Sequence, residues 1–129
     1  MSKKINLFII GMQKAGTTSI FNFLCKSSKI SHTKIKETNY FSDKIFIKDH
    51  YDLNNLHSNF LKNEFQLNNN IFKKKNSTYF LEGSVNHFYS KNAPKKILKY
   101  NPDAKFILII RDPIHRIISH YLMDLNLGI

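Results

Sequence analysis

The chain has 129 residues, of which 42% are hydrophobic, and it carries a formal net charge of +11 at pH 7. This composition excludes a disordered chain, and no apolar run approaches the ~20 residues needed to span a bilayer. The positive charge favours anionic partners, namely a nucleotide, an acidic glycan, a nucleic acid or a membrane surface.

The N-terminal part of the chain predicts a strand followed by a helix. Residues 5–10 are apolar enough for a strand that is buried on both faces. A helix is predicted from residue 17 to residue 26, with Ile20, Phe23 and Leu24 sharing one face at helical spacing. Between the strand and the helix lies a glycine-containing turn.

The middle of the chain gives weaker signals. Residues 30–35 predict a second short strand, and residues 51–65 favour a helix. The asparagine cluster at 68–70 and the lysine cluster at 73–75 favour loops. One domain of residues 1–129 accounts for a chain of this length.

Strand and helix alternate again in the last third of the chain. Residues 78–81 predict a strand, Pro94 stands near the start of a helix that runs to about residue 100, and residues 105–110 predict another apolar strand. A last helix has apolar residues at helical spacing: Ile114, Ile117, Ile118, Tyr121, Leu122 and Leu125. This order predicts an α/β fold of the P-loop type, in three layers with a mainly parallel sheet. Because the chain stops just past the last helix, we expect the fold to be truncated at the C-terminus.

The stretch from Gly11 to Ser19 has the frame of an anion-binding loop. Gly11 and Gly16 are separated by four residues, after an apolar strand and before a helix. Backbone N–H groups of such a turn and the positive end of the helix can bind an anion together. In nucleotide triphosphatases a lysine follows the second glycine, whereas here Thr17 takes that position and the lysine is Lys14. The loop therefore predicts an anion site, but not one built for the β- and γ-phosphates of ATP.

A second candidate group follows the predicted strand at 105–110. Arg111 stands at the carboxyl end of that strand, where ligands gather in parallel sheets, and its guanidinium suits a phosphate. Ser119, eight residues later, flanks the apolar face of the last helix and can place a hydroxyl near the same anion. The alternative interpretations are an ion pair between Arg111 and Asp112, and an ordinary surface serine at Ser119.

Two motifs resemble the cofactor motifs of sulfotransferases that use 3′-phosphoadenosine-5′-phosphosulfate (PAPS). They are Lys14-Ala15-Gly16-Thr17-Thr18-Ser19, and Arg111-Asp112-Pro113 through Ser119-His120-Tyr121. Two connecting segments resemble the carbohydrate (heparan-sulfate-type) branch and its bacterial relatives: Lys36-Glu37-Thr38-Asn39-Tyr40-Phe41 and Leu81-Glu82-Gly83-Ser84. The resemblance covers nearly the whole chain.

The resemblance implies a role for each motif residue. The 5′-phosphosulfate would be held by Lys14, Ala15, Gly16, Thr17, Thr18 and Ser19. The 3′-phosphate would be held by Arg111 and Ser119. Glu37 would be the general base for a hydroxyl acceptor, expected in this branch to be a saccharide, and Lys14 would neutralise charge on the leaving phosphate. No metal is required, and Asn39 stands where many of these enzymes have histidine.

The resemblance also sets the expected partners. They are the PAPS cosubstrate, the acceptor and a complementing C-terminal chain, since relatives extend beyond the second motif. No nucleic acid partner and no membrane span are expected.

Cys25 is the only cysteine, which fits a reducing compartment and a cytoplasmic location. The six histidines show no ligand spacing, so no metal site is assigned.

Two other functions stay open on the sequence alone. In a P-loop kinase or nucleotide hydrolase, the strand end at 107–110 with Asp112 would resemble a magnesium-binding site. A non-catalytic, truncated nucleotide- or polyanion-binding module would also fit the short, basic chain.

Overall fold

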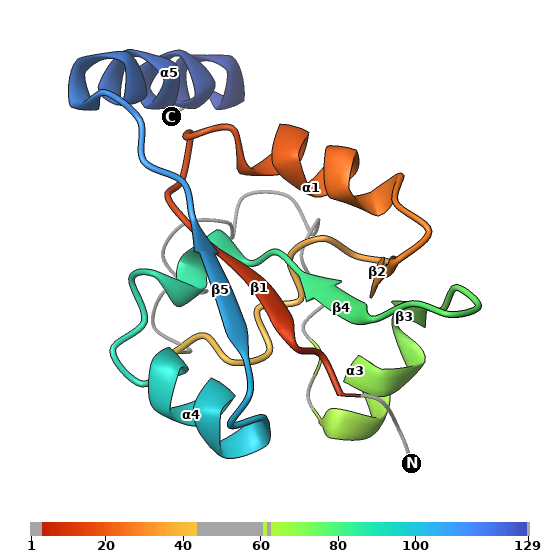
Figure 1. Ribbon diagram of the computed structural model, residues 1–129. Coiled ribbons are helices and arrows are strands. Elements are labelled where there is room, and N and C mark those ends of the chain that lie inside the picture. The colour runs from red at the N-terminus through yellow and green to blue at the C-terminus, as the bar shows by residue number, and fades with distance from the viewer. Residues whose placement is uncertain (1–3, 44–60, 62, 129) are drawn as a thin grey trace.

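The computed structural model describes residues 4–43, 61 and 63–128. A five-stranded sheet in the order β3–β2–β4–β1–β5 forms the middle of this part of the chain (Figure 1). Its strands are β1 (Leu7–Gly11), β2 (Ile30–Thr33), β3 (Ile71–Phe72), β4 (Tyr79–Glu82) and β5 (Lys105–Leu108). β1 pairs in parallel with β4 and β5, and β2 pairs in parallel with β4, whereas β3 runs antiparallel to β2. The predicted, mainly parallel sheet is confirmed.

Helices cover both faces of this sheet. α1 (Thr17–Cys25) covers one face, and α3 (Glu64–Asn69) and α4 (Ala93–Tyr100) cover the other. A short 3₁₀ helix, η1 (Val85–His87), follows β4, and α5 (Pro113–Leu127) follows β5. Under α1 the core consists of Leu7, Ile9, Phe21, Ile30 and Leu81. Under α3 and α4 it consists of Ile5, Phe8, Phe41, Leu67, Ile71, Phe80, Ala93, Ile97 and Tyr100. Alternate residues of β1 thus enter different cores, as expected for a strand buried on both faces, and the three-layer fold is confirmed.

The predicted elements lie where expected, with ends shifted by about two residues or less. The loop predicted at 68–70 is wrong, because α3 continues to Asn69. The side chain of Asn63 caps this helix by accepting a hydrogen bond from the backbone N–H of Gln66 at 2.9 Å. Most of the helix predicted at 51–65 lies outside the described residues.

The face predicted for the first helix is only partly right: Leu24 packs against the core, but Phe23 does not. Phe21 is 5% exposed, whereas Phe23 is 69% exposed. A Cβ on Gly83, just after β4, would lie only 2.9 Å from the ring of Phe21. The ring therefore packs into the space that this glycine leaves open, which decides how α1 is turned on the sheet.

Gly11 allows β1 to approach the turn after η1. Its φ is 143°, and a Cβ there would lie 2.8 Å from the Cβ of Phe88. We expect Gly11→Ala to lower the free energy of unfolding by about 2–4 kcal/mol, because strain and overpacking add. Gly128 also has a positive φ, 74°, but no heavy atom of the described residues lies within 4 Å of the point that a Cβ would occupy there.

Gly128→Ala is therefore the matched control, with an expected loss of about 1 kcal/mol from backbone strain alone. Urea denaturation followed by circular dichroism measures both losses. Equal losses in the two variants would contradict the steric explanation for Gly11.

The last helix is confirmed, but none of its residues is buried. Asp112 caps it by accepting hydrogen bonds from the backbone N–H groups of Ile114 and His115, both at 3.1 Å. Figure 1 shows α5 beyond the end of the sheet, next to the loop that precedes α1. More than half of each apolar side chain is exposed in Ile114, Ile117, Ile118, Tyr121, Leu122 and Leu125. We call these six residues the α5 apolar face.

Candidate active site

The carboxyl ends of β1 and β5 carry the two predicted motifs, and the structure joins them. Beyond the strands, the backbone N–H of Ile109 donates to the carbonyl of Gly11 at 2.9 Å, and that of Met12 donates to the carbonyl of Ile109 at 3.0 Å. Arg111 then donates from Nη1 to the carbonyl oxygen of Lys14 at 3.1 Å. Motifs that lie far apart in the sequence therefore form one edge of the sheet, as expected for neighbouring parallel strands.

The first motif ends at the N-terminus of α1. Gly16 precedes the helix with a φ of 91°, and no side chain of the described residues caps the helix there. Lys14 also has a positive φ, 60°. These two left-handed residues turn the chain from β1 directly into α1, so that the positive end of the helix lies at the carboxyl edge of the sheet.

A cavity of about 310 Å³ opens at this edge. Seven predicted site residues line it together: Lys14, Gly16, Thr17, Thr18, Glu37, Arg111 and Ser119. Ala15 and Ser19 are not among its lining residues. The N–H of Ala15 donates within the loop to the carbonyl of Met12 at 3.2 Å, and Ser19 is exposed on α1.

Lys36 also lines the cavity, and the sequence analysis missed it. Its Nζ lies 3.0 Å from Oε1 of Glu37 and 3.2 Å from Oγ1 of Thr17, with 17% of the side chain exposed. The ammonium group therefore links the carboxylate to the first residue of α1. Its position just after β2, at the carboxyl end of a parallel strand, is the signal that would have pointed to it.

Three cations and one carboxylate thus share the cavity. Lys14, Lys36 and Arg111 are the cations, and Glu37 is the carboxylate. Together with three hydroxyl groups and a helix N-terminus, this set suits an anion that carries several charges. The arrangement can bind phosphate or sulfate groups and offers a carboxylate that can accept a proton.

Behind Glu37 lies a second carboxylate, Glu82, with 0% exposure. It accepts hydrogen bonds from the backbone N–H and hydroxyl groups of both Thr38 and Ser84. The Nδ1 atom of His87 lies 3.4 Å from Oε2 of Glu82, without hydrogen-bond geometry. Burial lowers the pKa of the His87 imidazole, although the nearby carboxylates act in the opposite direction. This imidazole is therefore neutral at pH 7.

Asp112, the magnesium ligand expected in a nucleotide kinase or hydrolase, is not among the residues that line the cavity. It caps α5, and its Oδ1 also lies 3.1 Å from Nδ1 of His115. Among the described residues, no group of three or more histidine, cysteine, aspartate or glutamate side chains is placed to hold a metal ion. The capping contacts give Asp112 a structural role at the start of α5.

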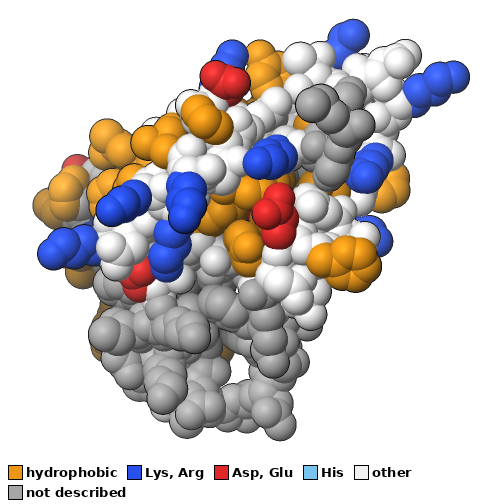
Figure 2. All heavy atoms as spheres, turned by 90° about the horizontal axis from the view of Figure 1, so that it is seen from below, with side chains coloured by type: hydrophobic (Ala, Val, Ile, Leu, Met, Phe, Trp, Pro, Cys, Tyr) orange, Lys and Arg blue, Asp and Glu red, His pale blue; other side chains and the backbone are white. Residues whose placement is uncertain are grey.

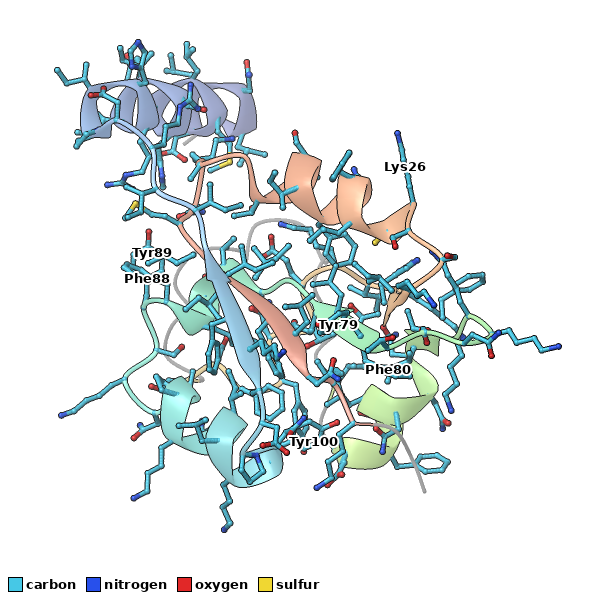
Figure 3. All side chains as sticks on the ribbon, in the orientation of Figure 1. Lys26, Tyr79, Phe80, Phe88, Tyr89 and Tyr100 are labelled. Atoms are coloured by element: carbon cyan, nitrogen blue, oxygen red, sulfur yellow. The ribbon has the colours of Figure 1, made fainter. Side chains whose placement is uncertain are left out.

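A second basic groove, of about 480 Å³, lies at the other end of the sheet. It is lined by Lys4, Tyr40, Phe41, Glu64, Lys96, Lys99 and Tyr100. Figure 3 shows Tyr100 at the opposite end of the sheet from Phe88 and Tyr89, which follow η1. Lysine and arginine side chains also gather on the face that Figure 2 shows from below. The net positive charge is therefore not confined to the cavity.

Two lysines of this groove have partners within the protein. Lys4 donates to the carbonyl of Tyr100 at 2.9 Å, and Lys96 pairs with Asp43 at 3.1 Å. These contacts tie the N-terminal segment and the segment after Phe41 to α4. They give both lysines a role in holding the fold together.

Known sulfotransferases are similar to this chain in sequence. The model of the "Sulfotransferase family" matches residues 6–127. Bifunctional heparan sulfate N-deacetylase/N-sulfotransferase 1 of Xenopus laevis is 33% identical over 118 residues, which are 89% of this chain and 12% of that protein. Membrane-associated sulfotransferase kil1 of Dictyostelium discoideum is 29% identical over 118 residues, which are 90% of this chain and 22% of that protein.

The fold agrees as well. A crystal structure of a sulfotransferase from Alicyclobacillus acidocaldarius matches 96% of this chain with a TM-score of 0.85, at 22% identity. The match spans 51% of that chain. This chain therefore spans about half of the solved sulfotransferase and a smaller share of the two relatives above. No helix in the described part is long and apolar enough to cross a membrane. From the family match over residues 6–127, we conclude that the chain belongs to the sulfotransferase family.

Proposed function

We propose that this chain forms the donor-binding and catalytic part of a sulfotransferase that transfers a sulfuryl group from PAPS to an acceptor hydroxyl. The observation that carries the proposal is the shared cavity, where Lys14, Lys36 and Arg111 surround Glu37 beside the N-terminus of α1. The chemistry of this set fits PAPS, because cations, hydroxyl groups and helix N–H groups all bind phosphate. Family membership supports the same donor.

When bound, PAPS supplies the sulfuryl group and leaves as 3′-phosphoadenosine-5′-phosphate (PAP). The first loop would hold the 5′-phosphosulfate. Thr17 and Thr18 would make the contacts inside the cavity, and Ala15 and Ser19 belong to the same motif. Arg111 and Ser119 would hold the 3′-phosphate, since both line the cavity on the side of the second motif.

Glu37 would accept the proton of the acceptor hydroxyl as that oxygen attacks sulfur. Lys14 would stabilise the negative charge that develops on the 5′-phosphate as its bond to sulfur breaks. Lys36 would hold the Glu37 carboxylate in place through their 3.0 Å contact. The proton acceptor Glu37 and the cation Lys14 thus come from different loops that line the same cavity.

A saccharide is the acceptor that we propose. The support is the similarity to heparan sulfate N-deacetylase/N-sulfotransferases, at 33% identity for the Xenopus laevis protein. Because the names of these relatives specify N-sulfotransferase activity, a test should offer both hydroxyl and amino groups. A transfer assay compares N-acetylated glycans, which offer hydroxyl groups, with N-deacetylated glycans, which also offer amino groups. Mass spectrometry of the product identifies the acceptor atom.

We also propose that a further polypeptide segment covers the α5 apolar face and completes the sulfotransferase domain. The support is the exposure of this face, where Ile117 and Tyr121 are both 61% exposed. Contiguous apolar surfaces of this kind mark interaction sites. The match to half of the solved sulfotransferase chain is consistent with such a segment.

Calorimetric titration with PAP and with ATP plus magnesium tests the donor. We expect PAP to bind at least about tenfold more tightly, a difference of ~1.4 kcal/mol. Arg111→Ala is expected to weaken PAP binding by about 10- to 100-fold, because charge-assisted hydrogen bonds contribute ~1.5–3 kcal/mol. Arg116→Ala is the control, since Arg116 lies on α5 and is not among the residues that line the cavity.

A preference for ATP would contradict the proposed donor and would favour the kinase or hydrolase alternative. PAP binding without any transfer to saccharides would instead favour the non-catalytic module.

A further inference from the structure

The segment that carries Glu37 is fastened to the end of β4 on both sides of this residue. Before it, the carbonyl of Lys36 accepts a hydrogen bond from the N–H of Gly83 at 3.1 Å. After it, the N–H and Oγ1 of Thr38 donate to Oε1 of Glu82 at 3.2 and 2.8 Å. Because the chain is held at both neighbours, the backbone of Glu37 has a fixed position relative to β4.

Glu82 is the centre of this network. Ser84 donates to it from N–H and hydroxyl, and the Oγ of Ser84 accepts from the N–H of Asn39 at 2.9 Å. Asn39 has a φ of 51°, so the chain turns sharply at the point where this bond holds it. The network therefore sets both the position and the direction of the segment after Glu37.

A buried carboxylate is costly unless its oxygens are fully hydrogen-bonded, and apolar residues fill an interior at lower electrostatic cost. Glu82 meets the first condition through Thr38 and Ser84. It is not among the residues that line the cavity, so it does not reach the reacting groups. Its contacts point instead to control over the placement of Glu37.

We propose that Glu82 is a positioning residue, which acts through Thr38 to hold Glu37 against the donor site. This inference rests on the proposed function, because it assumes that Glu37 accepts the acceptor proton. Neither Glu82 nor Thr38 is assigned a contact with donor or acceptor. The network should therefore affect turnover and leave donor affinity alone.

Thr38 offers a matched pair of variants, because it is buried and its hydroxyl donates to Glu82. Thr38→Val keeps the shape and removes that hydrogen bond. We expect kcat to fall by about 10- to 100-fold, since a misplacement of about 1 Å can cost 10²-fold. The Kd for PAP, measured by calorimetry, should change by less than about twofold. Thr38→Ser keeps the hydroxyl and should retain kcat within about threefold.

A double-mutant cycle separates positioning from a general structural role. In a Glu37→Gln background, Thr38→Val should reduce kcat by no more than about twofold, because the residue on which Thr38 acts no longer accepts a proton. A general structural defect would reduce kcat equally in both backgrounds, and that result would overturn the positioning role.

The remaining outcomes distinguish this inference from the proposed function. If Glu37→Gln lowers kcat and Thr38→Val does not, Glu37 remains the proposed general base and the positioning role of Glu82 is wrong. If Glu37→Gln retains the wild-type kcat, the proposed base fails, and the role assigned to Glu82 fails with it.

Amide hydrogen exchange tests the network without turnover. Glu82→Gln should speed exchange of the Thr38 and Asn39 amides by about tenfold or more, because their anchoring weakens. The amides of β1 and α1 should keep their protection, which also shows that the variant is folded. Unchanged exchange at both amides would overturn the proposal.

Discussion

Lys14→Ala is expected to reduce sulfuryl transfer by about 10²–10³-fold, the loss found when one preorganised group that stabilises developing charge is removed. Lys14 lines the cavity beside the N-terminus of α1 and is only partly exposed, so its charge is screened less than at the open surface. The expected loss is mainly in kcat, because the charge on the leaving phosphate increases in the transition state. Steady-state kinetics with PAPS and the preferred glycan measure this loss.

The backbone at Lys14 requires a control of its own. Its φ is 60°, a conformation that asparagine tolerates better than alanine. Lys14→Asn should therefore lose as much transfer activity as Lys14→Ala, but it should have a higher free energy of unfolding. Lys91→Ala, at an exposed lysine that is not among the cavity residues, should leave transfer unchanged. Activity retained in both Lys14 variants would exclude Lys14 from the chemistry.

The second large effect is expected at the α5 apolar face. Ile117 and Tyr121 lie one helical turn apart, and both are 61% exposed. In the absence of the segment proposed to cover them, they should make the protein self-associate. Replacing both by glutamate should weaken this association by about two orders of magnitude or more, because each buried apolar side chain contributes ~1.5–3 kcal/mol.

Sedimentation velocity over a concentration series measures this change. Glutamate favours helices, so α5 should persist, and circular dichroism checks that it does. Leu98→Glu, at a 46% exposed position on α4, controls for the effect of added charge on solubility. A wild-type protein that stays monomeric at high concentration would contradict the role of this face.

The sequence predicted the site well where chemistry depends on strand order. Lys14 and Arg111 each come soon after an apolar strand, and parallel neighbours bring their carboxyl ends to one edge of the sheet. That rule brings Lys14 and Arg111 to one cavity, whereas Glu37, which also lines it, was expected at the site only from the resemblance to sulfotransferases. The roles of these residues in donor binding and catalysis stay predictions until the variants are measured.

Long-range packing explains what the sequence did not reveal. Phe21 replaces Phe23 on the inner side of α1 because Gly83, some sixty residues later, leaves room for its ring. Lys36 reaches Thr17 from a segment after β2 that the end of β4 holds, through the hydrogen bond from the N–H of Gly83 to the carbonyl of Lys36. Apolar spacing gives the period of a helix, but it does not identify the neighbour that each face meets.

The last helix is a further example of this limit. Its apolar residues recur with the period of a buried helix, and the helix forms as predicted. Periodicity nevertheless gave no information on whether the described part of the chain would cover that face.

In the proposed binding mode, the hydrogen bond from Arg111 to the carbonyl of Lys14 would also couple the two ends of the donor thermodynamically. A phosphate that fixes Arg111 reduces the freedom of the Lys14 loop, so a second phosphate binds to a loop that is already ordered. The coupling is reciprocal, because each phosphate must favour the other by the same free energy. A nucleotide with both phosphates should thus bind cooperatively, with an affinity above that expected from its two singly phosphorylated fragments.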